Sequence, residues 1–125
     1  MSRKLTAVKK GHDLHDCLLA FTSNMLGVAG SLPEDRVGGH LSEQILRSAT
    51  AAYFRHGESE GASTSALFVE KWRSCLEQLR LCRRALQLVE KAGLPCDGEA
   101  IRQGLRDVDY LIRVFWSSIK TLETK

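Results

Sequence analysis

The sequence has few of the residues that interrupt helices or build strands. Only two prolines occur in 125 residues, and aromatic residues make up 6% of the chain, so helices are favoured over strands. No apolar run approaches the roughly 18 to 20 residues that span a bilayer, and the basic N-terminus leads into the polar segment Gly11-His12-Asp13 instead of an apolar signal core. We therefore expect a cytoplasmic protein with no membrane partner.

The four cysteines include no Cys-x-x-Cys pair, which argues against a zinc clamp or a redox pair. We expect reduced thiols, with Cys17, Cys75 and Cys82 packed as small hydrophobic residues. Hydrophobic residues make up 43% of the chain, and a chain of this length should bury roughly two thirds of its unfolded surface. The composition thus predicts one globular domain that folds without disulfide, metal or cofactor.

Apolar residues recur at steps of three and four in four segments, which is the spacing of amphipathic helices. The predicted core positions are Leu14, Leu18, Phe21, Met25, Val28 and Leu32; Leu41, Ile45, Ala49 and Ala52; Phe68, Cys75, Leu79, Cys82, Leu86 and Val89; and Ile101, Leu105, Val108, Ile112, Phe115 and Ile119. Breaks are predicted near residue 31, near residue 60 and at residues 93–95, where glycine, proline and polar residues gather. A serine or threonine before the third helix and Asp97 before the fourth are expected to cap these helices.

Helices of roughly 20 to 30 residues joined by short connections run antiparallel to their neighbours. The sequence therefore predicts an all-α fold, an antiparallel up-down-up-down four-helix bundle over residues 13–124, preceded by a flexible basic arm over residues 1–12.

The third predicted helix carries more apolar residues than one bundle face needs. Val69, Trp72 and Leu76 flank its core stripe on one side, and Leu81 and Leu88 flank it on the other. Further apolar residues lie off the stripes of the first and fourth helices, namely Leu19, Leu26, Leu111 and Trp116. Scattered surface hydrophobic residues are one explanation. Our preferred interpretation is self-association, with Val69, Trp72, Leu76, Leu81 and Leu88 as the oligomer interface and Trp72 as its aromatic anchor.

Several segments of the chain together carry a family resemblance. They are Leu32-Pro33, Leu41, the run Gln44-Ile45-Leu46-Arg47-Ser48-Ala49-Thr50 and the run Phe68-Val69-Glu70-Lys71. In these segments the chain resembles the small four-helix-bundle family encoded by intervening sequences of bacterial 23S rRNA genes, which includes the accessory protein of diversity-generating retroelements. The resemblance implies an antiparallel four-helix bundle, a homopentameric barrel, nucleic acid as a partner and, for the retroelement member, a reverse transcriptase. It implies no catalytic residues. The chain departs from the family pattern at Tyr53 and Arg55 late in the second helix, and at Gln78 and Leu81 in the third.

The residues that commonly carry catalysis do not occur here at catalytic spacings. The sequence has no Gly-x-Ser-x-Gly elbow, no phosphate-binding glycine loop, no HExxH helix and no Glu-x-x-His pair of a di-iron bundle. His12, His15 and Asp16 have a spacing compatible with a metal, but a solvated helix start explains them better. His40 and His56 lack spaced partners and are interpreted as structural. The glycine pair Gly38-Gly39 permits either close packing or a kink. We expect no enzymatic activity.

Basic residues form one stripe on each of the last two predicted helices. The stripes comprise Arg73, Arg80, Arg84 and Lys91, and Arg102, Arg106, Arg113 and Lys120. One interpretation is an ordinary solvated face, because Glu77 and Asp109 lie beside the stripes and can form ion pairs at i, i+4. The other is a phosphate-binding surface, since arginine binds phosphate oxygens in pairs and a ring of copies would multiply the net charge of +3.

Together these observations predict a non-enzymatic, homopentameric bundle that binds structured RNA or DNA through its backbone phosphates. The predicted nucleic-acid-binding residues are Arg73, Arg80, Arg84, Arg102, Arg106, Arg113 and Lys120. The alternative is a protein-binding scaffold or accessory subunit, with a reverse transcriptase or another protein as its partner and no direct contact to nucleic acid.

Overall fold

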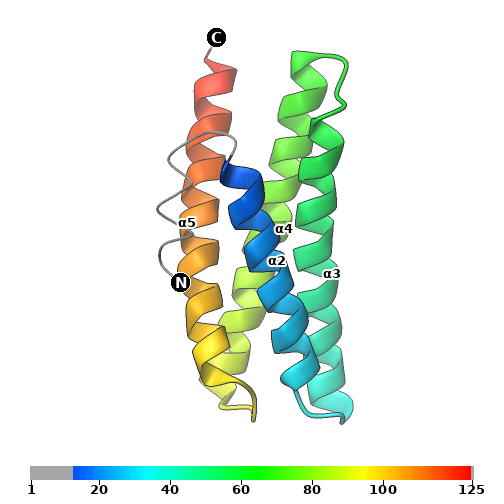
Figure 1. Ribbon diagram of the computed structural model, residues 1–125, viewed down its shortest axis with the longest axis vertical. Helices are drawn as coiled ribbons and strands as arrows, with labels where there is room; N and C mark the ends of the chain where they lie inside the picture. The colour runs from blue at the N-terminus through cyan, green and yellow to red at the C-terminus, as the bar shows by residue number, and fades with distance from the viewer. Residues whose placement is uncertain (1–12, 125) are drawn as a thin grey trace.

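The computed structural model describes residues 13–124 and consists of four helices joined by short connections (Figure 1). They are α2 (Asp13–Ser31), α3 (Arg36–Ser59), α4 (Ser65–Ala92) and α5 (Gly98–Glu123). Each helix packs against the next one in the chain, and α2 also packs against α5, which closes the bundle. The predicted all-α, antiparallel four-helix bundle is confirmed. The predicted arm, residues 1–12, lies outside the described residues.

The helix ends follow the local signals of the sequence. The Asp35 carboxylate accepts a hydrogen bond from the backbone N–H of Gly38 at 2.8 Å, and the Thr64 hydroxyl accepts one from Leu67 at 3.1 Å. Asp97 caps α5 in the same way, through the backbone N–H of Ala100 at 3.2 Å. These bonds satisfy backbone donors that have no partner within the helix.

The C-terminus of α4 also follows its predicted signal. Gly93 has a φ of 68°, and its backbone N–H donates to the carbonyls of Val89 and Glu90. This left-handed conformation suits glycine, so the predicted glycine cap is confirmed. The second connection, residues 60–64, lies at the predicted break near residue 60, because α3 continues through Gly57 to Ser59.

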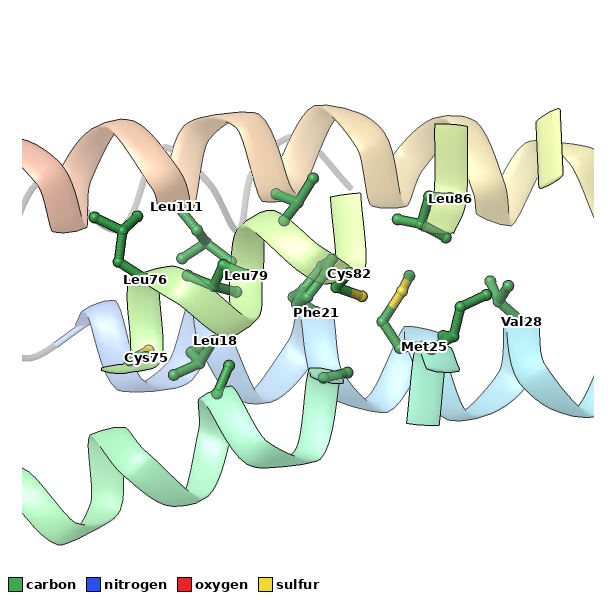
Figure 2. Close-up of a cluster of buried hydrophobic side chains, with 14 of the residues drawn as sticks. Leu18, Phe21, Met25, Val28, Cys75, Leu76, Leu79, Cys82, Leu86 and Leu111 are labelled. Atoms are coloured by element: carbon green, nitrogen blue, oxygen red, sulfur yellow. The ribbon is translucent and has the colours of Figure 1, made fainter. Parts of the chain in front are cut away.

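The core lies along the bundle axis, where side chains from the helices meet (Figure 2). Phe21, Met25, Leu79, Leu86 and Phe115 are fully buried. Burial of a side chain of this size stabilises a fold by about 1.5 to 3 kcal/mol.

The predicted burial of three cysteines is also confirmed. Cys17, Cys75 and Cys82 are buried, and all four cysteines, Cys96 included, are free thiols. Burial raises the pKa of Cys75 to about 12.

The core stripes match the predictions for α2 and α3, whereas the buried face of α5 is rotated from the predicted one. Leu111 is fully buried, although it lies off the predicted stripe, while Leu105 and Ile112 are only partly buried. Gly104 is buried opposite Met25, where an added Cβ would lie 2.6 Å from the Met25 methyl carbon. Gly104 and Leu111 are two turns apart on the same face of α5, and this face packs inside the bundle.

Candidate nucleic-acid interface

The two predicted basic stripes lie on neighbouring antiparallel helices, α4 and α5. All seven predicted nucleic-acid-binding residues are exposed. Arg83 Nε lies 2.7 Å from Asp109 Oδ1, and Arg73 forms an ion pair with Glu123, so the start of α4 lies beside the end of α5. The structure therefore brings Arg73, Arg80 and Lys120 together around one hollow between α4 and α5, whereas Arg84 lines a groove between α3 and α4.

Ion pairs divide the stripe residues into two groups. Arg102 pairs with Glu99 at 2.8 Å, while Arg73 and Lys120 share Glu123. The hydrogen bond from Arg102 and its charge lower the pKa of the exposed Glu99 carboxyl. The positive charge of these three cations is therefore partly neutralised.

The other five stripe cations have no carboxylate partner within residues 13–124: Lys91 and the four arginines Arg80, Arg84, Arg106 and Arg113. Arg106 donates to Gln103 Oε1 at 2.8 Å, and the Arg113 guanidinium carbon lies 5.9 Å from the centre of the Tyr110 ring. Both contacts orient a guanidinium without cancelling its charge. These four arginines are the stripe residues best able to bind an anion.

The distribution of charge along the chain is uneven. Of the net charge of +3, residues 1–12 supply four positive charges and no negative ones, and Lys125 supplies one more, so residues 13–124 carry a formal net charge of −2. Within them, α4 holds six basic and three acidic residues, whereas α5 holds four of each. Attraction for phosphate from the described bundle is therefore a local property of α4 and the adjoining edge of α5.

A hollow of about 200 Å³ lies between the two stripes. It is lined by Arg73, Leu76, Glu77, Arg80, Trp116, Ile119, Lys120 and Glu123. Trp116 is 49% exposed, and Lys120 Nζ lies 5.4 Å from the centre of its ring, within the range of a cation–π interaction. The predicted exposure of Trp116 is confirmed.

The predicted oligomer interface is only partly on the surface. Leu81 and Leu88 are 56% and 54% exposed, and they border a groove of about 520 Å³ between α3 and α4. Leu76 is buried in the core, so its predicted place on an exposed flank is wrong. It faces α5, whose Leu111 is buried with it.

Trp72 is also not an exposed anchor. The centre of its ring lies 4.7 Å from the ring centre of Phe115 and 5.1 Å from that of Phe68. Its indole N–H donates to Ser59 Oγ at 3.0 Å. The side chain thus fills space between α3, α4 and α5, and Val69 and Phe68 beside it are only partly buried. The prediction of Trp72 as an exposed anchor is wrong because its ring contacts Ser59 of α3 and Phe115 of α5, which cover it.

Exposed apolar residues also occur elsewhere on the bundle. Leu19 and Leu26 are 45% and 49% exposed on α2, as predicted. Phe54 on α3 is 59% exposed and lies outside the predicted set. Its position on the helical wheel opposite Leu41 and Ile45 is the signal that identifies it.

Two histidines that are distant in the sequence stack on each other, with His15 partly exposed and His56 buried. His56 is buried at the junction of α2, α3, α4 and α5, and its ring centre lies 6.2 Å from that of His15. His15 Nε2 is 3.1 Å from the hydroxyl of Tyr53, and His56 Nδ1 has no hydrogen-bond partner among the described residues. Burial lowers the pKa of His56. The interpretation of His56 as structural agrees with this packing.

The structure offers no metal site within the part of the chain that it describes. No group of three or more histidine, cysteine or acidic side chains is arranged to hold an ion there, and His12 lies outside that part. In the same region, no helix combines the length and apolar character that crossing a bilayer requires.

Comparison with known proteins identifies a shared fold. No protein-family model and no curated protein sequence matches this chain. Among solved structures, the chain is similar to a protein of unknown function from the S23 ribosomal protein family of Bacteroides thetaiotaomicron. The two superpose with a TM-score of 0.75 at 23% sequence identity, over 86% of this chain and 98% of the other. At this identity, the similarity shows that the two proteins have the same four-helix architecture.

Proposed function

We propose that this protein is a non-enzymatic, self-associating helical bundle that binds the phosphate backbone of structured nucleic acid through α4 and α5. The observation that carries the proposal is the set of four exposed arginines, two on each helix, that have no carboxylate partner among residues 13–124. Guanidinium groups of this kind bind phosphate oxygens in pairs.

The four arginines lie at similar levels along the bundle axis, which supports the proposal. Arg80 and Arg84 are separated by about 6 Å along the helix axis, and Arg106 and Arg113 by about 10 Å, at 1.5 Å per residue. The ion pair between Arg83 and Asp109 shows that these two residues lie at the same level of the bundle. Arg80 and Arg84 are within one turn of Arg83 on α4, and Arg106 and Arg113 are about one turn from Asp109 on α5. A patch of this size suits a phosphate backbone and contains no arrangement that would read base sequence.

The shared fold and the sequence resemblance support the same proposal. The structural neighbour belongs to the S23 ribosomal protein family, and the sequence resembles the family of 23S rRNA intervening sequences. We infer kinship with that group. The homopentamer and the reverse transcriptase partner rest on the sequence resemblance alone.

Self-association is the second part of the proposal. Leu81 and Leu88 are large, exposed and one heptad apart, and the groove beside them continues onto α3 through Leu41 and His40. A second copy that covers this groove would remove apolar surface from water. Because Arg84 also lines the groove, the assembled protein would bind phosphate through Arg80, Arg106 and Arg113. Several copies would also present several arginine patches to one nucleic acid, which raises the apparent affinity.

The nucleic-acid part is tested by fluorescence anisotropy with a labelled RNA hairpin between 50 and 200 mM salt. We expect binding at low salt, and we expect R80Q/R106Q, which leaves the groove beside Leu81 and Leu88 intact, to weaken it and to lower the salt slope by about 1 for each phosphate that is no longer bound. The matched control is R36Q/R47Q, which removes the same charge from α3. Absence of wild-type binding at low salt, or equal losses of affinity for the two variants, would overturn the proposal.

The self-association part is tested by light scattering. The chain has a mass of 13.9 kDa, so the wild type is expected at several times that mass and L81S/L88S at a lower mass. L19S/L26S on α2 is the control and should keep the wild-type mass. A wild-type monomer would refute self-association. Leu76 and Trp72 are unsuitable for this test, because their substitution damages the core.

A second candidate function is a protein-binding scaffold. The exposed apolar residues on other helices, Leu19, Leu26 and Phe54, favour it, because a nucleic-acid partner would not cover them. Capture from nuclease-treated lysate separates the two functions. A protein partner is retained after nuclease treatment, whereas one bridged by nucleic acid is removed.

A further inference from the structure

Trp116 occupies an unusual position for the largest apolar side chain. The other tryptophan, Trp72, packs inside the bundle and uses its indole N–H in a hydrogen bond. Trp116 instead leaves about half of its surface, 49%, in solvent at the hollow between α4 and α5. An exposed aromatic ring that the fold leaves uncovered is a surface on which a planar group can stack.

The charges around the hollow indicate which planar group fits. Arg73, Arg80 and Lys120 line it together with Glu77 and Glu123, so cations outnumber carboxylates. Glu123 is already engaged by Arg73 and Lys120, whereas Arg80 has no ion pair within residues 13–124. The hollow therefore presents an aromatic face beside an available guanidinium, which suits a planar ring attached to a phosphate.

We propose that an unpaired base of a nucleic acid stacks on Trp116 while an adjoining phosphate binds Arg80. This inference rests on the proposed function and adds the class of ligand, which is nucleic acid with single-stranded or looped-out nucleotides. A hollow of about 200 Å³ can receive one heterocyclic base. Stacking on an aromatic side chain tolerates any base and, together with cationic groups along the backbone, is a general mode of single-strand recognition.

The position of Lys120 is compatible with this binding mode. Its ammonium lies over the Trp116 ring at 5.4 Å from the centroid, and both residues are on the surface of α5. A lysine side chain has several rotatable bonds, so it can leave the ring face and pair with the phosphate when a base takes its place. Paired bases in a duplex have both faces covered by their neighbours and cannot use the ring in this way.

The experiment compares three probes: an unstructured 15-nucleotide single strand, the matching duplex, and polyphosphate, which has charge but no bases. Trp116→Leu is expected to weaken single-strand binding about tenfold and to leave duplex and polyphosphate binding unchanged. Trp116→Phe should restore most of the affinity, because it keeps an aromatic face. Phe54→Leu, which alters an exposed aromatic residue on α3, should change none of the three.

Tryptophan fluorescence gives an independent measure of stacking. The single strand should quench the emission of the wild type, and the quenching should disappear in Trp116→Phe, which keeps only Trp72.

The inference would be overturned if Trp116→Leu left single-strand affinity unchanged, or if it lowered the affinity for all three probes equally. A fall in the mass of Trp116→Leu by light scattering would also overturn it, because the ring would then belong to a self-association surface. If the wild type binds no nucleic acid at all, the proposed function fails. If it binds with no role for Trp116, only this inference fails.

Discussion

The fold holds the imidazole of His56 in an apolar environment. Its ring centre lies 5.8 Å from Trp72 on α4 and 5.9 Å from Phe115 on α5, and His15 on α2 stacks on it at 6.2 Å. Burial is the main reason for its lowered pKa; the charge of Glu60 raises the pKa and His15 lowers it. The neutral imidazole is therefore the form that the bundle accommodates.

This environment predicts a loss of stability in mild acid. The unfolded chain takes up a proton near pH 6.5, whereas folded His56 does so only at a lower pH. The free energy of unfolding should therefore fall as the pH drops below 6.5, by at most about 1.4 kcal/mol per pH unit from this residue. Urea unfolding from pH 8 to 5.5 measures the slope. His56→Phe should reduce the slope of unfolding free energy against pH. The control is His40→Gln, at an exposed position, which should keep the wild-type slope. Equal slopes in the two variants would contradict this explanation.

The adjacent glycines 38 and 39 are predicted to respond oppositely to alanine. A Cβ on Gly38 would lie 2.0 Å from the carbonyl oxygen of Pro33, a backbone atom that cannot easily move, while a Cβ on Gly39 would have nothing within 4 Å. Gly38→Ala should destabilise the protein by about 1 to 3 kcal/mol, and Gly39→Ala should stabilise it by up to about 1 kcal/mol. Thermal unfolding of the two variants measures both changes in stability. A Gly38→Ala protein as stable as the wild type would show that the turn can relax. Of the two roles left open by the sequence, the structure assigns close packing to Gly38.

At the scale of the element, the helix caps should contribute separately to stability. The Thr64 hydroxyl accepts the backbone N–H of Leu67, and no neighbouring helix is needed for that bond. Thr64→Ala should therefore cost about 1 kcal/mol of unfolding free energy, measured by denaturant titration. Ser63→Ala, one residue earlier and outside the cap, is the control. Equal effects from both substitutions would count against capping.

The spacing of apolar residues within one helix predicts the buried face of α2 but not that of α5. The periodicity of α2 predicts its stripe, because a helix that packs with one narrow face reveals that face through the spacing of its apolar residues. On α5 the periodicity alone does not identify Leu111 as buried. Leu111 and its neighbour Ile112 are both apolar, and the rotation of α5 against the other helices buries Leu111 and leaves Ile112 only partly buried.

At the scale of the whole molecule, the bundle should protect three thiols together. Burial raises the pKa of Cys17 and of Cys82 to about 11 and that of Cys75 to about 12, and all three are buried in the core. Because the thiolate is the reactive form, these thiols should react with an aromatic disulfide reagent only when the bundle opens. Cys96, in the connection before α5, is partly exposed and should react first.

A thiol titration checks this prediction. One fast equivalent is expected in buffer and four in denaturant, and Cys96→Ser should remove the fast equivalent. Rapid reaction of more than one thiol in the native protein would show that the core opens more readily than its packing indicates.

The sequence by itself determined the fold class, the helix ends and most of the core, because capping residues, glycine, proline and apolar periodicity act over a few neighbouring residues. It also located the cations of both stripes. Tertiary structure alone decided which flanking residues are covered: Leu76 and Trp72 turn inward, whereas Leu81 and Leu88 remain outside. It also decided which arginines keep their charge available, since pairs such as Arg73 with Glu123 form between helices. Both outcomes depend on how each helix is rotated and placed against its neighbours, and that geometry is set by the packing of all four helices together.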